Sequence, residues 1–459
     1  MKVSSYSGSW YPERAAELNS LLEDRFEESR RRRPYLYPGG LGFVVPHAGP
    51  AYCGAVAAAA YRSLERLNPE QVVVLAFPHQ GGLSGVAAPD VDRISTPLGE
   101  AAIDPGFGGF PLVPDARVCD HSFEIQLPFL QRAVPRARIT PLYAGRLSAQ
   151  ERAGAAQALA ACWRPGVVFV ASSDFTHYGR DFGFTPFPPD HAVAGRLREL
   201  DTECIEAAAT LDSARFLETL ERNQATVCGS GPIALLIETL RRLDADLYLD
   251  TLDYQTSGEL TGDYRHSVSY AALGWYPRPS FDLDQGDRSV LLESAERTLD
   301  ELRRTGRRRA IPAAGGSPAL DSRRGMFVSL HQGPELLGCV GNISGHGPMS
   351  EDAANLTLAA ALEDPRFRPA AEAAGPIHIE ISALTPFRRI FHAGQCRAGI
   401  HGLFLRLGGA SGLLLPQVAA ERGWQAEEFL EAVARKSGLG KRAWRDPKAR
   451  LYVFEAQVF

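Results

Sequence analysis

Side chains that can bind metal or transfer protons follow three apolar segments in the first half of the chain. His47 and His79 each come after a proline that ends an apolar run, and Asp174 and His177 closely follow a third run. Short β-branched runs of this kind are typical of buried parallel strands. Ligands of open α/β sheets bind beyond the carboxyl ends of such strands, so the sequence predicts a site at this sheet edge. The three runs are residues 41–45, 72–77 and 167–171.

The spacing between His47 and His79 supports a shared site. It is close to the roughly 30 residues of one strand–helix–strand unit. It includes an alanine-rich segment, residues 54–64, that favours a helix. A right-handed crossover would return the chain to a parallel strand and bring both imidazoles to one edge. Neighbouring strands lie about 4.8 Å apart, so two such imidazoles can share one metal ion.

Cys228 supplies a thiol in a glycine-rich turn before residues 233–240, an apolar segment predicted to be a helix. The dipole of a helix N-terminus favours a nearby thiolate. A thiolate with two neutral imidazoles suits a borderline or soft transition metal and leaves a fourth position for water, dioxygen or substrate. We therefore predict His47, His79 and Cys228 as metal ligands. The alternative is that the imidazoles are ordinary polar groups at strand ends and that Cys228 is a small buried residue.

Three further side chains are candidates for catalysis by proton transfer. Asp174 and His177 are close in sequence, and His177 is the better base because histidine titrates near neutral pH. His121 adds an imidazole that is predicted to line the pocket, either behind the ligands or in proton transfer. Its neighbours Asp120 and Ser122 also fit as caps of a helix that begins there.

The composition indicates a globular protein with more than one domain. At 459 residues the chain exceeds what one core usually supports, which predicts two or three domains. A net charge of −5 argues against a nucleic-acid binder, and no apolar run is long enough to predict a membrane span. Seven cysteines without CxxC spacing, and an N-terminus without an apolar leader, predict a cytoplasmic location. No motif for a nucleotide cofactor is evident.

A proline-containing segment divides the chain. Residues 267–275 alternate in the manner of a strand, and the turn formers after them have neither helical nor strand periodicity. A helix is predicted for residues 289–302, where apolar side chains recur with helical period. We therefore predict a first domain at residues 1–277, a linker at 278–288 and a second domain at 289–459.

Taken together, the motifs of the first domain resemble the Memo family. The fold of that family is similar to that of the class III extradiol ring-cleaving dioxygenases. Those enzymes hold non-haem Fe(II) with two histidines and a carboxylate, and use a further histidine as acid/base. The resemblance implies an α/β domain of three layers with a mainly parallel sheet. The matching segments occur in the family's order and are Gly8–Tyr11, Pro46–Gly49, Tyr52–Gly54, the His79 turn, Asp120–Glu124, Ser172–Gly179, Cys228–Gly229 and Ser267–Ala272.

By position, the resemblance assigns the three predicted ligands to the Memo metal site, with Cys228 standing where the dioxygenases have a carboxylate. His177 falls at the acid/base histidine, and Asp174 and His121 match residues that line the pocket. One turn departs from the family: residues 76–80 read Ala-Phe-Pro-His-Gln instead of Gly-Pro-Ser-His-His. A thiolate in place of a carboxylate shifts metal preference toward copper or zinc. Fe(II) or copper is therefore the expected metal, with zinc a further option.

The second domain resembles the AMMECR-type domain, which implies an α/β (α+β) fold for residues 289–459. The order of predicted elements carries this resemblance: strands at residues 326–330 and 377–386, then an amphipathic helix at 426–436. Between the two strands lies the motif Leu-Leu-Gly-Cys, where the family usually has Leu-Arg-Gly-Cys.

Cys339, His401 and Gln417 are the candidate residues for a second site in this domain. Cys339 follows Gly338 in the motif, where the backbone can approach a ligand closely. A tight bend with a buried cysteine is the alternative. Leu337 takes the place of the family's arginine, so an anion contact that this arginine makes in relatives is expected to be lost here.

The two domains in this order resemble the fused form of the AmmeMemoRadiSam system, which implies a radical SAM enzyme as a partner. The chain has no CxxxCxxC motif, so radical SAM chemistry would come from another protein. The first hypothesis is a metal-dependent, dioxygenase-like redox protein that acts with that partner. One alternative is a metal-independent hydrolase or transferase with Cys228 as nucleophile and His177 as base. The other is a non-enzymatic scaffold that binds a small molecule or peptide.

Overall fold

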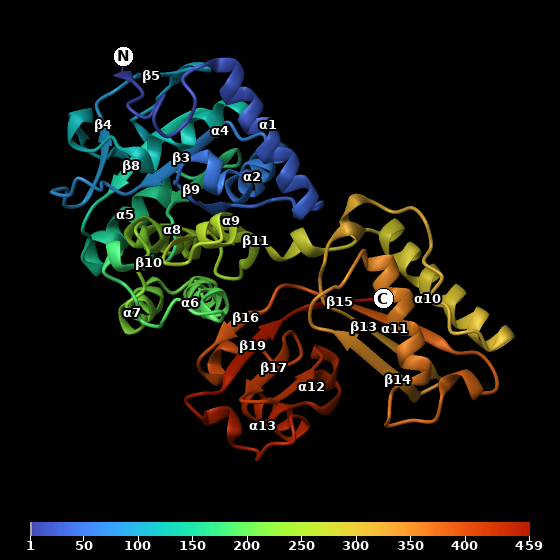
Figure 1. Cartoon of the computed structure of the whole chain (residues 1–459). Helices are drawn as coiled ribbons and strands as arrows, with labels where there is room; N and C mark the ends of the chain where they lie inside the picture. The colour runs from blue at the N-terminus through green and yellow to red at the C-terminus, as the bar shows by residue number, and fades with distance from the viewer. Residues whose placement is uncertain (1) are drawn as a thin grey trace. The chain divides into compact units, whose positions relative to one another are not determined.

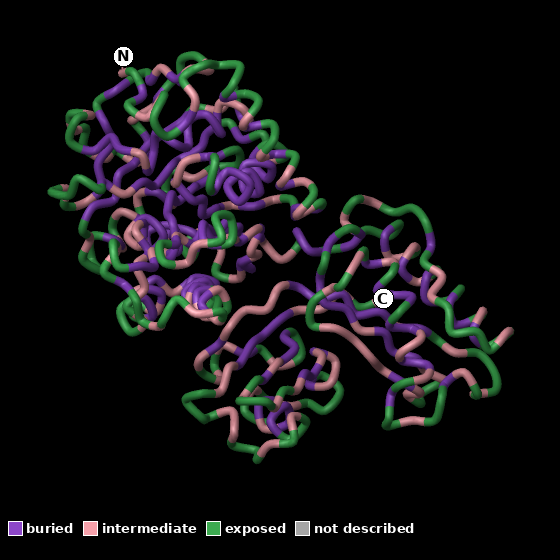
Figure 2. The backbone as a smooth tube through the Cα atoms, viewed as in Figure 1, coloured by how far each residue is buried: buried purple, intermediate pink, exposed green. Residues whose placement is uncertain are grey.

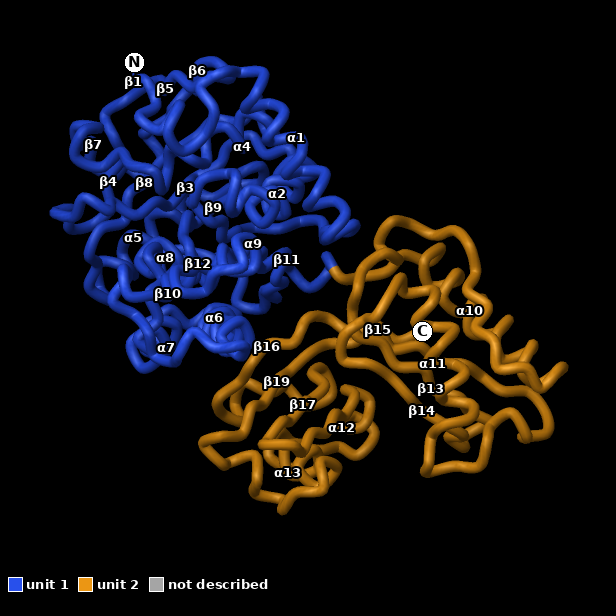
Figure 3. The backbone as a smooth tube through the Cα atoms, in the orientation of Figure 1, with its two compact units in different colours: residues 1–280 blue, residues 281–459 orange. Residues whose placement is uncertain are grey.

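The computed structural model describes residues 2–459, which form two compact units. Unit 1 extends to Ser280 and unit 2 comprises Phe281–Phe459 (Figure 3). The division falls inside the segment 278–288 that was predicted as a linker. Helix α10 (Gln285–Thr305) begins within that segment, earlier than predicted, because the Asp284 carboxylate caps its first turn by accepting a hydrogen bond from the Asp287 amide at 2.8 Å.

Unit 1 is built around a nine-stranded sheet. The central strands β2, β9, β3 and β8 run parallel, and antiparallel pairs lie toward both edges. This arrangement confirms the predicted α/β class, with the parallel pairing at the centre of the sheet. In spatial order the strands are β10 (His177–Gly179), β12 (His266–Tyr276), β2 (Gly42–Val45), β9 (Val167–Ser172), β3 (Gln71–Ala76), β8 (Arg138–Ala144), β4 (Val86–Pro89) and β7 (Leu112–Val113), with β11 (Tyr248–Thr256) paired to β12.

Helices cover both faces of this sheet, which gives the predicted three layers (Figure 1). Helices α1 (Ala15–Arg32), α2 (Pro50–Leu67) and α4 (Gln126–Ala133) pack together on one face, and α5 (Ala149–Ala161) and α8 (Ser230–Leu243) on the other. Strands β2, β3 and β9 are buried along their whole length (Figure 2). Gly42 lets α8 approach closely, because a Cβ at this position would lie 2.9 Å from a methyl carbon of Leu240.

The remaining elements of unit 1 lie around these layers. A small sheet has the order β1 (Lys2–Val3), β5 (Arg93–Thr96), β6 (Gly99–Ala102). The other helices are α3 (His121–Glu124), α6 (Val193–Ala208), α7 (Ser213–Asn223) and α9 (Ser257–Thr261). Short 3-10 turns are η1 (Phe107–Gly109), η2 (Asp115–Arg117) and η3 (Arg180–Phe182), and η4 (Arg278–Phe281) spans the division between the units.

The strand order differs from the simplest expectation in one respect. Strands β2 and β3, which lead to His47 and His79, are parallel but are not neighbours, because β9 lies between them. The loop after β9 therefore enters the site between the two histidine loops. This position allows Ser172 and Asp174 to contact His47, as described below.

Unit 2 contains two four-stranded antiparallel sheets, in agreement with the predicted α+β arrangement. Helices α10 and α11 (Met349–Leu362) pack on the first sheet, and α12 (Pro416–Arg422) and α13 (Ala426–Lys436) pack on the second. The first sheet has the order β14 (Glu335–Asn342), β13 (Met326–Gln332), β15 (His378–Leu384), β20 (Ala456–Val458). The second has the order β16 (Arg388–Ile390), β19 (Arg450–Phe454), β17 (Gly402–Leu407), β18 (Ala410–Leu414). The 3-10 turns are η5 (Pro318–Asp321), η6 (Ala370–Glu372), η7 (Ala393–Gln395) and η8 (Ala443–Arg445).

Across residues 2–459, no helix combines the length and the apolar character that crossing a membrane requires.

Candidate metal centre

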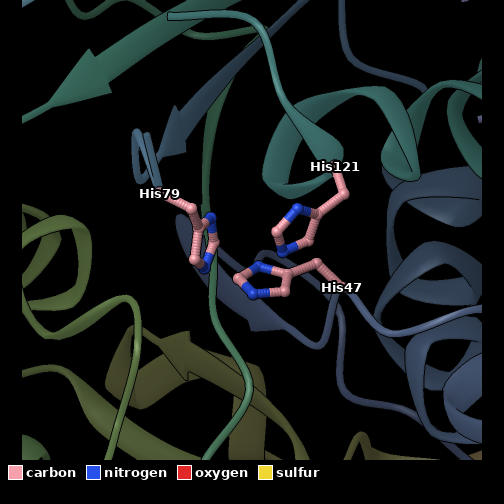
Figure 4. Close-up of side chains that lie close together, drawn as sticks. All are labelled: His47, His79 and His121. Carbon is pink, nitrogen blue, oxygen red and sulfur yellow. The ribbon is translucent and has the colours of Figure 1, made fainter. Parts of the chain in front are cut away.

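Three imidazoles converge at the carboxyl edge of the main sheet. His47 lies in the loop after β2, His79 lies in the loop after β3, and His121 is the first residue of α3 (Figure 4). Their ring centroids are 5.2 Å apart for His47 and His79, 5.1 Å for His47 and His121, and 4.1 Å for His79 and His121. One ring nitrogen of each lies within 4.8 Å of the others. The sequence placed His121 in the lining of the pocket, whereas the structure places it beside both predicted histidine ligands.

The environment favours the neutral form of His47 and His121. Burial lowers the pKa of His47 well below the usual histidine value, and the neighbouring imidazoles lower it further. Burial and the charge of His79 lower the pKa of His121 to about 4. Neutral imidazoles retain a nitrogen lone pair each, which is the form that binds transition metals. The group therefore fits a metal ion by the chemistry of its donors.

Asp120 fixes the orientation of His79. Its Oδ2 accepts a hydrogen bond from the His79 backbone amide at 2.6 Å and lies 3.0 Å from the imidazole Nδ1. Its Oδ1 caps α3 by accepting from the Ser122 amide at 2.9 Å, which confirms the capping alternative. Burial raises the pKa of Asp120, but the hydrogen bonds from His79 and Ser122 outweigh burial and lower the pKa overall. The carboxylate therefore holds a proton on Nδ1 and leaves Nε2 of His79 as the lone-pair nitrogen.

Ser172, at the end of β9, fixes the orientation of His47 in a similar way. The Nδ1 atom of His47 lies 3.1 Å from the Ser172 hydroxyl, which also accepts a hydrogen bond from Nε2 of Gln126 at 3.0 Å. Neither Ser172 nor Gln126 was predicted as a site residue. The signal for Gln126 was available, since it is a polar residue within an otherwise apolar run that begins a helix.

Cys228 lies against the first histidine. Its Sγ atom is 3.1 Å from Nε2 of His47, although the thiol lies outside the group of three imidazoles. Gly229 permits this approach, because a Cβ there would lie 2.5 Å from the Ser172 carbonyl oxygen. Burial and the nearby Asp174 raise the pKa of the Cys228 thiol, so burial outweighs the expected effect of the α8 terminus. The role of Cys228 as a metal ligand stays a prediction.

Asp174 is turned toward the backbone of the His47 loop. Its Oδ1 accepts a hydrogen bond from the His47 amide at 2.8 Å, and the carboxylate accepts another from the Ala48 amide. Burial raises the pKa of Asp174 to about 6, opposed by the charge of His177 and by these hydrogen bonds. The side chain thus holds the turn that presents His47, and its predicted part in proton transfer stays a prediction.

His177 begins β10 and is held by the loop that precedes Cys228. Its amide donates to the Thr226 hydroxyl at 2.8 Å, and its Nδ1 lies 3.0 Å from the carbonyl oxygens of Phe175 and Thr226. Two carbonyl acceptors place the proton on Nδ1, so Nε2 carries the lone pair. This is the form that a general base requires.

Asp201, on α6, anchors the loop that carries Asp174 and His177. This buried carboxylate accepts hydrogen bonds from the Thr176 hydroxyl at 2.6 Å and the Tyr254 hydroxyl at 2.7 Å. Sequence reasoning missed Asp201. The available signal was an aspartate on the apolar face of an amphipathic helix, between Leu197 and Cys204.

The three candidates for a second site lie in unit 2, and their shared site stays a prediction. Gln417 contacts the first sheet, with its Nε2 3.4 Å from Glu380 Oε1, and Cys339 lies on β14 of the same sheet. His401 is held within its own turn, where its Nδ1 accepts a hydrogen bond from the Arg397 amide at 3.1 Å.

Comparisons with known proteins match each unit. Residues 2–274 match the family described as "Memo-like protein", and residues 292–459 match the family described as AMMECR1. A MEMO1 family protein of Methanosarcina barkeri is 34% identical over 283 residues, which are 60% of this chain and 99% of that protein. The "Protein memo-1 homolog" of Caenorhabditis elegans is 28% identical over 297 residues, or 61% of this chain and 83% of that protein. The crystal structure of an uncharacterized Pyrococcus horikoshii protein is 33% identical, covers 37% of this chain and 88% of that chain, and has a TM-score of 0.35.

Proposed function

The chain belongs to the Memo-like protein family through residues 2–274, and on that premise we propose that unit 1 is a metal-dependent, non-haem redox protein. Its metal ligands would be His47, His79 and His121, with the sulfur of Cys228 as a further ligand beside His47. The convergence of three imidazoles, with one ring nitrogen of each within 4.8 Å of the others, carries this proposal. The loop positions of His47 and His79 support it as well, since each follows a strand of the main sheet.

The donor set favours iron or copper, with zinc as a further option. Imidazole nitrogen suits all three metals, and a thiolate ligand favours copper and zinc over harder ions. When bound, such a metal would supply Lewis acidity and, for iron or copper, one-electron exchange with dioxygen or substrate.

The protein residues would orient the ligands and move protons. Asp120 and Ser172 fix the ring orientations of His79 and His47 through the hydrogen bonds described above. His177 would act as the acid/base at its Nε2 atom, since its Nδ1 faces two carbonyl oxygens. Asp174 would keep the His47 turn in place through its two backbone amide contacts.

Metal analysis of anaerobically purified protein tests the proposal. Wild-type protein should contain about one iron or copper ion per chain, and His47→Ala and His79→Ala should lose it. Dioxygen uptake by the loaded protein, screened with catechol-like and thiol compounds, would then identify the reaction. Stoichiometric metal in both variants would contradict the assignment of the ligands.

The contact between Cys228 and His47 favours a second candidate function. A thiol 3.1 Å from an imidazole nitrogen resembles the pairing of a cysteine nucleophile with its base. The partner in this pair is His47 rather than the predicted His177. A metal-independent hydrolase or transferase would keep its activity after exhaustive chelation and lose it on alkylation of Cys228. Loss of activity on chelation alone would exclude this candidate.

We further propose that the protein works in the cytoplasm with a radical SAM enzyme. The Memo-like region precedes the AMMECR1 region in one chain, and this order supports a radical SAM partner. The seven cysteines have no CxxC spacing, which supports a cytoplasmic location. Affinity purification of the full chain from its own cell extract should recover a protein with a CxxxCxxC motif. If binding occurs but no redox activity is found, the scaffold that binds a small molecule or peptide becomes the better description.

A further inference from the structure

The first sheet of unit 2 has an apolar face under its helices and an opposite face that is polar around Ser329. Val328, Leu330, Ile379 and Ile381 belong to the core that α10 and α11 cover. Because side chains alternate along a strand, the residues between them point to the opposite face. There, Ser329 is paired in register with Cys339 on β14 and with Glu380 on β15. A thiol, a hydroxyl and a carboxylate therefore lie in a row across three strands.

A side-chain ion pair clamps the backbone of Cys339. The Cys339 amide donates to Asp364 Oδ2 at 2.9 Å, and its carbonyl accepts from the Arg366 guanidinium at 3.0 Å. Arg366 also donates to both oxygens of Asp364, at 2.8 and 2.6 Å. Strand β14 is an edge strand, so this pair satisfies the backbone groups that a further strand would otherwise bind. The thiol is thereby held in a fixed position.

The thiol is oriented away from the helices. Gly338 packs against α11 so closely that a Cβ there would lie 2.1 Å from the Ala360 carbonyl oxygen. Cys339 therefore projects to the polar face, where the Ser329 hydroxyl donates a hydrogen bond to its Sγ at 3.2 Å. Cys339 as a residue is partly exposed.

Positive charge lies at the Cys339 end of the row. Arg366 interacts with the Cys339 side chain as well as with its backbone. Lys436, the last residue of α13, lies close enough to sense the charges of Arg366, Cys339 and Asp364. Burial and Arg366 lower the pKa of Lys436. Leu337 stands where the AMMECR-type motif usually has an arginine, so in this chain the cations beside the thiol come from Arg366 and α13.

Hydrogen-bond acceptors lie at the other end. The Gln417 amide reaches Glu380 at 3.4 Å and the Ser382 hydroxyl at 3.3 Å. The Oε1 atom of Gln417 is buried and has no hydrogen-bond partner within the described residues. A buried acceptor without a hydrogen bond destabilises the folded protein, and a hydrogen-bond donor on a ligand would remove this destabilisation. The carboxylate of Glu380 beside it also favours a donor.

We propose that this row is a ligand site for a small molecule that carries a carboxylate at one end and N–H donors at the other, as an amino acid or short peptide does. Lys436 binds the carboxylate, because Arg366 is engaged with Asp364 and the Cys339 carbonyl. Glu380 and Gln417 bind the N–H groups. The row spans about 10 Å across three strands, which suits a ligand of that size. The Cys339 thiol lies beside the anionic end. The site belongs to unit 2 and does not depend on the metal centre.

Alkylation of the full chain with a matched pair of reagents tests the site. Iodoacetate carries a carboxylate and iodoacetamide does not, so the ratio of their rates at a cysteine reports the local preference for an anion. Peptide mass spectrometry gives this ratio for Cys339 separately from the other cysteines, with N-acetylcysteine as the chemical reference. We expect the ratio at Cys339 to exceed the reference by about threefold or more, and to fall as salt is added.

Three variants make the test specific. Lys436→Gln should bring the ratio back toward the reference, and Glu380→Gln should raise it further, because it removes a negative charge. Lys441→Gln, at a lysine of unit 2 that pairs with Glu431, should leave it unchanged. Thermal unfolding of each variant checks that the fold is kept. A ratio at Cys339 equal to the reference, no reaction at Cys339 with either reagent, or equal effects of the two lysine variants would overturn the proposal.

Discussion

Asp120 accepts two hydrogen bonds from His79, one from its backbone amide at 2.6 Å and one from its imidazole Nδ1 at 3.0 Å. The same carboxylate caps α3, whose first residue is His121. One buried side chain therefore positions two of the three converging imidazoles. His47 is held differently, by the Ser172 hydroxyl and the Asp174 carboxylate at the end of β9. The rigidity of the candidate metal centre thus comes from residues that would not touch the metal.

The first prediction concerns Asp120. Asp120→Asn removes the negative charge that holds the proton on Nδ1 of His79, so the ring loses its fixed orientation. We expect metal affinity to fall about 10- to 100-fold, as is usual for partners of metal-binding histidines. Competition with a chelator of known affinity measures this change. Asp90→Asn, at an exposed aspartate of the same unit, is the control and should bind metal like wild type.

The second prediction concerns the sulfur beside His47. If Cys228 is a ligand, the copper-loaded protein should show a thiolate-to-copper absorption band, and Cys228→Ser should lose the band. The serine variant should keep most of its metal, because three imidazoles remain. His121→Ala should instead weaken metal binding while the band persists. An identical spectrum in wild type and Cys228→Ser would show that the sulfur does not bind the metal.

The local pattern of the sequence was sufficient to predict the strands and the loops that carry the site. The apolar runs before His47 and His79 correspond to β2 and β3, and the run before Asp174 corresponds to β9. Hydrophobic periodicity and proline positions are local signals, and they place residues at strand ends reliably. The two histidine loops also lie close together, as predicted. Their strands are not adjacent, however, because β9 lies between β2 and β3.

Strand order and side-chain direction could not be predicted from the local sequence pattern. The placement of β9 between β2 and β3 depends on how helices pack over long distances in the chain, which no local pattern encodes. His121 was predicted to line the pocket, and only the tertiary fold brings the start of α3 against His79. The Asp174 carboxylate could face the pocket or the backbone, and the His47 amide accounts for its observed direction.

The third prediction is a dependence of stability on pH in unit 2. Hydrogen bonds from Arg366 lower the pKa of Asp364 from 3.8 to about 2. A depressed carboxyl pKa contributes stability that is present above the unfolded value and is lost as pH falls toward the folded value. Because half of the Arg366 side chain is exposed, we expect a contribution of about 1 kcal/mol.

Calorimetric unfolding of wild type and Asp364→Asn measures this effect. The variant should be less stable at pH 6, and the gap should narrow as the pH falls from about 4 toward 2. Glu363→Gln, at the exposed neighbouring residue, should show no such gap at any pH. A gap that stays constant down to pH 2 would mean that the variant acts by a route other than this ion pair.

The last prediction concerns Asp201, which holds the loop of Asp174 and His177 from a distance. In Asp201→Asn, an amide NH₂ replaces one of the two acceptor oxygens. On the Thr176 side it would meet the Thr176 backbone N–H, which can only donate, and on the Tyr254 side the hydroxyl would lose its acceptor. We expect a loss of about 1–3 kcal/mol in the free energy of unfolding. Tyr254→Phe removes one donor and leaves the carboxylate bonded to Thr176, so it should cost less stability.

Metal content should stay near wild type in both variants, because neither change reaches the three imidazoles. Any activity that needs His177 should fall more in Asp201→Asn. Equal losses of stability in the two variants would indicate that the carboxylate itself is not the anchor of the loop.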